Sequence, residues 1–275
     1  MTLRSYLFVP GDHTERFAAA LATDAHQVVI DLEDGVAHDT KDRAREQLAV
    51  WLQTALTDAD RGRVVVRVNA SGSPWHDDDV AMFKDAPLHH LMVPKVEDAA
   101  ELAALAARAG DGTIVIALVE SVAGVVQLRD IAQAPGVARL AFGSSEFGID
   151  AGIEGSGSEL DAVRSAFVIA SRHAGLPAPI DGVTRSPDKP GTTDTPDAIA
   201  AAVTTARRFG FGGKLCLHGS HVEAINHGFA PTEAQREWAT NVVTAWTAHP
   251  QGATTFDGKF VDKAMLDRAK RIMAS

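Results

Sequence analysis

Short apolar runs rich in β-branched residues recur along the chain, and each ends in a charged or strongly polar residue. Residues 28–30 run into an acidic DLED segment, 64–66 run into Arg67, and 114–119 run into Glu120. Continuous apolar runs of this length are typical of strands that are covered on both faces, as in a parallel sheet. We expect such strands at 5–9, 27–32, 63–68, 89–94, 113–119, 138–142, 178–182 and 213–217.

Segments of helical character separate the expected strands. Thr40 can cap a helix, the Ala-, Leu- and Glu-rich 97–107 segment favours another, and Ser158 opens a third with Gly175 at its end. A fourth begins at 194–196. Strands that alternate with helices eight times predict an α/β fold, a (β/α)8 TIM barrel, in which catalytic residues gather at the carboxyl ends of the strands.

Two segments lie outside this repeat. Residues 184–193 (TRSPDKPGTT) follow the seventh strand and are a candidate substrate lid. The chain also continues for 57 residues after His218, more than one closing helix needs. We therefore predict a barrel at 1–230 and a C-terminal helical extension at 231–275, which packs on the barrel or on a neighbouring subunit.

The composition of the chain excludes some classes of binding partner and indicates a cellular compartment. A net charge of −10 argues against nucleic acid, because phosphate binding needs clustered Lys and Arg. The single cysteine, Cys216, lies in an apolar run and is expected to be a buried, inert thiol. There is no signal segment and no apolar stretch near the roughly 20 residues of a membrane span, so we expect a cytoplasmic protein with no membrane partner.

Two glutamates that follow neighbouring strands are candidate metal ligands. Glu120 and Glu146 come after the fifth and sixth strands, and adjacent strands lie only about 4.8 Å apart. Two carboxylates completed by waters and substrate oxygens are a normal environment for Mg²⁺. The alternative is that each glutamate pairs with an arginine or caps the helix that follows it.

Arg67 and Lys95 each allow a functional and a structural interpretation. The Arg67 guanidinium suits a substrate carboxylate or a developing enolate, or it forms an ion pair with the acidic residues at 31–34. Lys95 could form a Schiff base, although we favour a counter-ion for the same acidic group.

Three further positions carry weaker signals. His218 and His221 could form a metal pair, but a glycine lies in the turn between them, which disfavours it. Backbone N–H groups of the turn at Gly11 could hold an anion.

A series of short motifs occurs in order along almost the whole chain. The motifs are RSYLFVPG (4–11), VIDLEDGV (29–36), KDRAR (41–45), VRVN (66–69), VPKVE (93–97), ESVAG (120–124), FGSSE (142–146), GFGGK (210–214) and FAPT (229–232). Together they resemble the citrate lyase β-subunit-like members of the HpcH/HpaI aldolase/citrate lyase family.

The resemblance implies a (β/α)8 barrel, commonly a homotrimer or dimer of trimers, that uses Mg²⁺ or Mn²⁺ to make or break a carbon–carbon bond beside a carbonyl. Substrates in the family are often CoA or carrier thioesters of small hydroxy acids. Arg67 matches the substrate-binding arginine, and Glu120 matches the first metal carboxylate, beside the substrate. An acidic residue that moves a proton is expected at Asp34, in the Glu33/Asp34 pair, or at Asp262 from an adjacent subunit.

The chain departs from the family pattern at defined positions. The second metal ligand of the family is an aspartate, where an ungapped alignment puts Glu146, with Asp150 at a later aspartate of the motif. His218 is followed by glycine rather than proline, and Asp262 by Lys263 rather than proline.

The leading hypothesis is a Mg²⁺-dependent carbon–carbon lyase or aldolase that acts on a small hydroxy-carboxylate, free or as a CoA thioester, like citryl-CoA or malyl-CoA lyases. The alternatives are an acyl-CoA thioesterase or malate-synthase-like activity on the same barrel, and a catalytically impaired barrel that binds an acyl-CoA.

Overall fold

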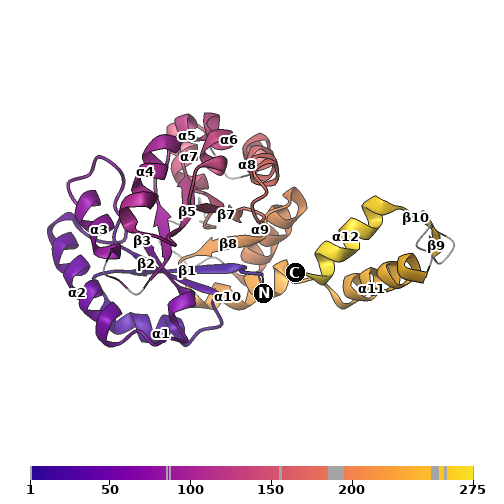
Figure 1. The fold of residues 1–275 in the computed structure, drawn as a ribbon, viewed down its shortest axis with the longest axis horizontal. Coiled ribbons are helices and arrows are strands. Elements are labelled where there is room, and N and C mark those ends of the chain that lie inside the picture. Colours follow the sequence, from indigo (N-terminus) through magenta and orange to yellow (C-terminus); the bar gives the residue numbers. More distant parts are fainter. Residues whose placement is uncertain are drawn as a thin grey trace. The chain divides into compact units, whose positions relative to one another are not determined.

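Eight parallel strands close into a barrel in the order β1 to β8. The structure is a computed structural model that describes residues 2–84, 86, 88–154, 157–184, 195–248, 254–256 and 259–274. Helices surround the strands (Figure 1), so the predicted α/β barrel is confirmed. The strands are β1 Ser5–Pro10, β2 Gln27–Asp31, β3 Val64–Arg67, β4 His90–Val93, β5 Ile114–Val119, β6 Val137–Phe142, β7 Ile180–Asp181 and β8 Gly213–Cys216.

Every strand buries both of its faces. One core cluster takes a residue from each strand, including Tyr6, Val29, Val65 and Met92, whereas the alternate valines of β3, Val64 and Val66, are also fully buried. This double burial explains why the strands are continuous apolar runs in the sequence.

The helices begin and end where local chemistry permits. Thr195 accepts the N–H of Ala198 at the start of α9, and Gly210 ends that helix in the left-handed conformation. The predicted cap at Thr40 is wrong: its hydroxyl donates to Ala37 O and caps no backbone N–H. The helices of the barrel are α1 Phe17–Leu21, α2 Lys41–Thr54, α3 His76–Phe83, α4 Ala99–Ala109, α5 Val122–Val126, α6 Leu128–Gln133, α7 Ser144–Asp150, α8 Asp161–His173, α9 Pro196–Phe209 and α10 Val222–Phe229.

The chain divides into two compact units, Leu3–Gly228 and the segment from Phe229 onward with Thr2. The second unit contains α11 (Glu233–Ala248), a two-stranded sheet of β9 (Thr254–Phe256) and β10 (Lys259–Val261), and α12 (Lys263–Met273). Small and apolar side chains join its two helices into a core of their own, formed around Ala239, Val242, Val261 and Ala269.

Two expectations concern segments outside the barrel core. The candidate lid at 184–193 lies outside the described residues from 185 on. No helix among the described residues is both long and apolar enough to cross a membrane.

Candidate functional site

The carboxyl ends of the strands enclose a pocket of about 380 Å³. Its apolar lining includes Phe8, Leu118 and Leu215. The ionisable side chains along it come from different strand ends and loops, and they are Arg16, Asp31, Asp34, Arg67, Glu120, Glu146 and His218. The pocket therefore unites the arginine and both glutamates that the sequence singled out.

Arg67 is the central cation of this pocket. Its Nε and Nη2 each donate to a carboxylate oxygen of Asp31 at 2.7 Å, and its Nη1 lies 2.9 Å from Glu33 Oε2. The guanidinium also packs over the ring of Phe8, 4.8 Å from the centroid. Burial opposes the charged form, but Asp31, Glu33 and Glu120 outweigh it and raise the pKa of Arg67. The ion pair with the acidic segment is thus present, and the same guanidinium faces the pocket.

Asp31 also stabilises the loop that follows β2. Its two oxygens accept the N–H groups of Glu33 (2.9 Å) and Gly35 (2.7 Å). A Cβ at Gly35 would lie 2.5 Å from Asp31 Oδ2, so only glycine fits there. Asp31 therefore fixes the loop after β2 from within.

A buried lysine, Lys41, also stabilises this loop. The sequence predicts no role for this residue. Lys41 Nζ donates to Leu32 O, Glu33 O and Asn69 Oδ1 at 2.6–2.9 Å. Asn69 in turn donates through its N and Nδ2 to Asp79. The only signal for this network was the presence of Lys41 and Asn69 in the ordered motifs, because no pattern in the sequence predicts a contact between these two residues, which are 28 positions apart.

Lys95 pairs with the acidic loop. Its ammonium donates to Glu33 and lies 3.7 Å from Asp34 Oδ1. Burial opposes its charge, but the contacts with Glu33 and Asp34 raise the pKa of Lys95. A Schiff-base lysine needs the unprotonated amine, so the geometry supports the counter-ion interpretation. Glu33 is buried, which raises its pKa against the influence of Arg67 and Lys95, whereas Asp34 is exposed at the pocket.

Glu120 is buried, 4% exposed, and has no direct ion pair among the described residues. Its Oε1 accepts the backbone N–H of Lys95 at 2.9 Å, and a Cβ at Gly143 would lie 2.5 Å from its Oε2. Burial, then repulsion from Glu33 and Glu146, raises the pKa of Glu120 to about 8. A cation bound beside Glu120 would stabilise the charged form of this carboxylate.

Glu146 lies in the first turn of α7 and is half-buried at the same pocket. Asp150, the other candidate from the alignment, accepts the N–H of Val122 at 2.7 Å and is exposed. Within the described part of the chain, no group of three or more His, Cys, Asp or Glu is arranged to hold a metal. The candidate donors remain the two carboxylates of Glu120 and Glu146, a set that suits Mg²⁺ because this ion usually keeps several waters.

The remaining candidates each have a different environment. His218 is exposed at the pocket and His221 is buried, with their rings edge to face at 5.3 Å. The prediction of an anion site at Gly11 is wrong, because the backbone N–H of Gly11 donates to Asp31 O. Cys216 is buried, which raises the pKa of its thiol to about 12. Asp262 accepts the N–H of Met265 and caps α12 in the second unit.

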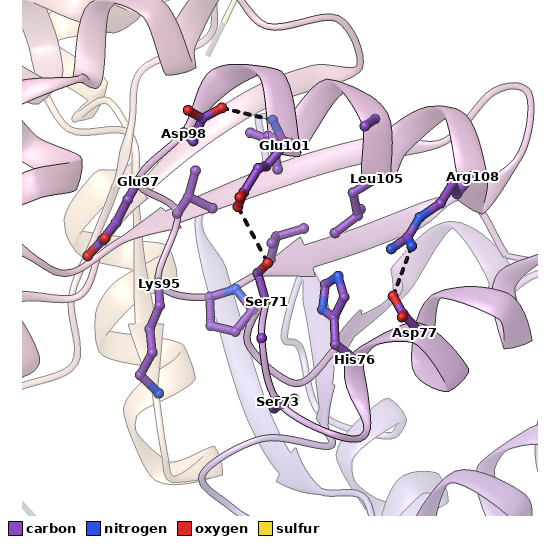
Figure 2. A pocket seen from close by; sticks show the side chains of 16 residues that line it. Ser71, Ser73, His76, Asp77, Lys95, Glu97, Asp98, Glu101, Leu105 and Arg108 are labelled. Carbon is purple, nitrogen blue, oxygen red and sulfur yellow. Dashed lines mark hydrogen bonds and ion pairs between the residues drawn. The ribbon is translucent and has the colours of Figure 1, made fainter.

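A second hollow, of about 510 Å³, is lined by α3, α4 and the loops before them (Figure 2). Its acidic side chains are already engaged, since Asp77 pairs with Arg108 at 2.9 Å and Asp98 caps α4. The side chain of Lys95 extends away from Glu101 and Arg108 in this view. We therefore place the chemistry at the mouth of the barrel.

Arg67→Ala should lower the free energy of unfolding by about 3–5 kcal/mol, because it leaves the buried carboxylates of Asp31 and Glu33 without their cation. Urea unfolding measures the loss. Arg108→Ala, which removes a surface ion pair with Asp77, is the control and should cost no more than about 1 kcal/mol. Equal losses in the two variants would contradict a structural role for the Arg67 pair.

The raised pKa of Glu120 predicts a stability that falls with pH in the metal-free protein. Between 4.5 and about 8 the folded state keeps a proton that the unfolded state releases, so the free energy of unfolding declines by up to about 1.4 kcal/mol per pH unit. In urea titrations with a chelator, Glu120→Gln should flatten this decline, and the exposed-site variant Glu237→Gln should not. An unchanged slope in Glu120→Gln would refute the raised pKa.

Comparison with known proteins identifies one family. The model of the HpcH/HpaI aldolase/citrate lyase family matches residues 4–219. A citrate lyase subunit beta-like protein of Deinococcus radiodurans is 33% identical over 99% of this chain and 96% of its own. A (3S)-malyl-CoA thioesterase of Cereibacter sphaeroides is 30% identical over 98% of this chain and 93% of its own.

Solved structures show the same fold. The crystal structure of CitE from Mycobacterium tuberculosis in complex with magnesium, acetoacetate and coenzyme A has a TM-score of 0.80 at 28% identity, and covers 99% of this chain and 97% of its own. A citrate lyase beta subunit of the same organism, complexed with oxaloacetate and magnesium, has a TM-score of 0.70 at 29% identity, over 84% and 98% of the two chains. The chain belongs to the HpcH/HpaI aldolase/citrate lyase family.

Proposed function

We propose that the protein is a Mg²⁺-dependent carbon–carbon lyase that cleaves or forms a small hydroxy-carboxylate, taken as a CoA thioester. The observation that carries this proposal is the buried carboxylate of Glu120, without an ion pair among the described residues, at one pocket with Glu146 and Arg67. Similar proteins whose structures hold magnesium with acetoacetate and coenzyme A, or with oxaloacetate, support the choice of ligands.

Glu120 and Glu146 would hold the ion, Mg²⁺ or Mn²⁺. When bound, it supplies a Lewis acid for the substrate oxygens. In the cleavage direction a carboxylate accepts the proton of the substrate hydroxyl, the carbon–carbon bond breaks, and the electron pair moves onto the thioester as an enolate. Arg67 faces the pocket with a fixed positive charge and would stabilise that enolate without reorganisation.

The candidates for proton transfer are acidic side chains of different origin. Asp34 is exposed at the pocket, and Glu33 next to it is buried and bound to Arg67 and Lys95. Asp34 is therefore the better candidate for proton transfer, because a substrate in the pocket can reach its carboxylate more easily than that of Glu33. Asp262 is the third candidate, and by family resemblance it would come from a neighbouring subunit of a homotrimer or a dimer of trimers.

Thioester hydrolysis is the second candidate function, because a relative 30% identical to the chain is named a (3S)-malyl-CoA thioesterase. The same pocket would then polarise the thioester carbonyl while water attacks it. The two reactions differ in their products: the lyase yields acetyl-CoA and an oxo acid, whereas the hydrolase yields free CoA and the hydroxy acid.

Product analysis distinguishes these functions. Incubation with malyl-CoA, methylmalyl-CoA or citryl-CoA should release acetyl-CoA or another acyl-CoA with glyoxylate, pyruvate or oxaloacetate, whereas the free acids, which carry no CoA, should release none of these oxo acids. A chelator should abolish release, and added Mg²⁺ or Mn²⁺ should restore it. Free CoA alone would establish the thioesterase, and binding without either product would indicate an impaired acyl-CoA-binding barrel.

Glu146→Asp tests the proposed second metal ligand. The carboxylate retreats by one methylene, and a displacement of about 1 Å at a reacting centre can change rates about 100-fold, so metal affinity and turnover should both change by about tenfold or more. Calorimetry with Mn²⁺ measures the first. Asp150→Asn, in the same helix but bound to Val122, is the control and should bind Mn²⁺ like the wild type. If both variants bind like the wild type, Glu146 is not a ligand.

A further inference from the structure

Lys95 has a backbone conformation that suits glycine. Its φ is +51°, and it is the only non-glycine residue with positive φ among the described residues. The left-handed region brings the Cβ of an L-residue too close to a carbonyl oxygen, so glycine and asparagine normally occupy it. A lysine at this position therefore needs a compensating interaction.

This conformation lets one residue contact two different carboxylates. The backbone N–H of Lys95 donates to Glu120 Oε1 at 2.9 Å, and its ammonium donates to Glu33. Glu33 and Glu120 are both buried carboxylates that contact this one residue, so their charged forms repel each other. Lys95 follows β4, so it joins the acidic loop after β2 to the candidate metal ligand after β5.

Glu120 is thereby held in one orientation. The Lys95 N–H occupies Oε1, and Oε2 lies in space that exists only because residue 143 is glycine, since a Cβ there would lie 2.5 Å from it. The ammonium of Lys95 is 45% exposed and makes no contact with Glu120 within ion-pair distance among the described pairs. The hydrogen bond from Lys95 to Glu120 is therefore made by the backbone, and the ammonium acts on Glu120 only as a charge at longer range.

We propose that Lys95 is a positioning residue: its ion pair with Glu33 stabilises a left-handed turn, and that turn aims the backbone N–H at Glu120 so that Oε2 is presented to the metal ion. The inference rests on the proposed function in one respect, namely that Glu120 is a metal ligand. The side chain of Lys95 acts on the metal site by maintaining the backbone conformation of its own residue.

A purely electrostatic role for Lys95 makes the opposite prediction. Loss of a nearby positive charge favours a divalent cation, because like charges repel, so every neutral substitution would tighten metal binding to the same extent. The backbone role instead separates glycine, which adopts the left-handed turn without strain, from an unbranched neutral side chain, which does not.

The experiment compares Lys95→Gly, Lys95→Met and Lys95→Arg by Mn²⁺ calorimetry and thermal unfolding. K95G loses the ammonium but keeps the turn, so its Kd for Mn²⁺ should stay within about threefold of the wild type or tighten. K95M lacks both the ion pair and glycine's freedom, so it should leave the turn and lose the hydrogen bond to a charged group, which weakens binding by about tenfold or more. K95R keeps the ion pair with Glu33 and should restore near wild-type affinity.

Thermal unfolding provides a readout that does not depend on metal. In the presence of a chelator, K95G should melt about 2–4 °C above K95M, because it carries no left-handed strain. Equal Mn²⁺ affinities of K95G and K95M would overturn the positioning role while leaving the metal site intact. If the wild type itself binds no Mn²⁺, the proposed metal site is wrong, and equal melting temperatures would then overturn the account of the turn as well.

Discussion

The ion pair between Asp31 and Arg67 is the interaction on which the mouth of the barrel depends. The parallel register of β2 and β3 places these two residues side by side, and both are nearly inaccessible to water. Either charge alone would be costly to bury. With both present, Asp31 has oxygens available for the N–H groups of Glu33 and Gly35, so the ion pair also shapes the loop that supplies the acidic residues of the pocket.

Charge around this pair is unevenly distributed. Arg67 and Lys95 provide the cations that contact Glu33, whereas Glu120 accepts the backbone N–H of Lys95 and has no ion pair within the described part of the chain. Glu146 adds a further negative charge to the same pocket. Arg67 and Lys95 are therefore committed to Asp31 and Glu33, whereas Glu120 and Glu146, which follow β5 and β6, repel each other in their charged forms. This asymmetry favours a divalent cation at Glu120 and Glu146 and an anionic substrate group near Arg67.

The sequence predicted the features that depend on local pattern. Continuous apolar runs identified the strands of a fully covered parallel sheet, and the residue after each run identified the side chains at the pocket. The ion-pair alternatives for Arg67 and Lys95 were also open to prediction, because their partners follow neighbouring strands. Glu120 and Glu146 as ligands stay a prediction, although the structure places both at one pocket.

Contacts between backbone segments that only folding brings together could not be predicted from the sequence. Lys41 meets Leu32, Glu33 and Asn69 only because α2 packs behind the loops after β2 and β3, and no sequence pattern shows the left-handed turn at Lys95. Gly11 failed as an anion site for the same reason, since its N–H is used by the neighbouring strand.

The most direct measurement for the central claim is anomalous diffraction from crystals of the protein soaked in Mn²⁺. We expect one strong anomalous peak in the barrel mouth, from an ion bound by one carboxylate oxygen each of Glu120 and Glu146, with Glu120 Oε1 still accepting the Lys95 N–H. A peak bound elsewhere, or an ion that displaces the Lys95 N–H from Glu120, would contradict this expectation.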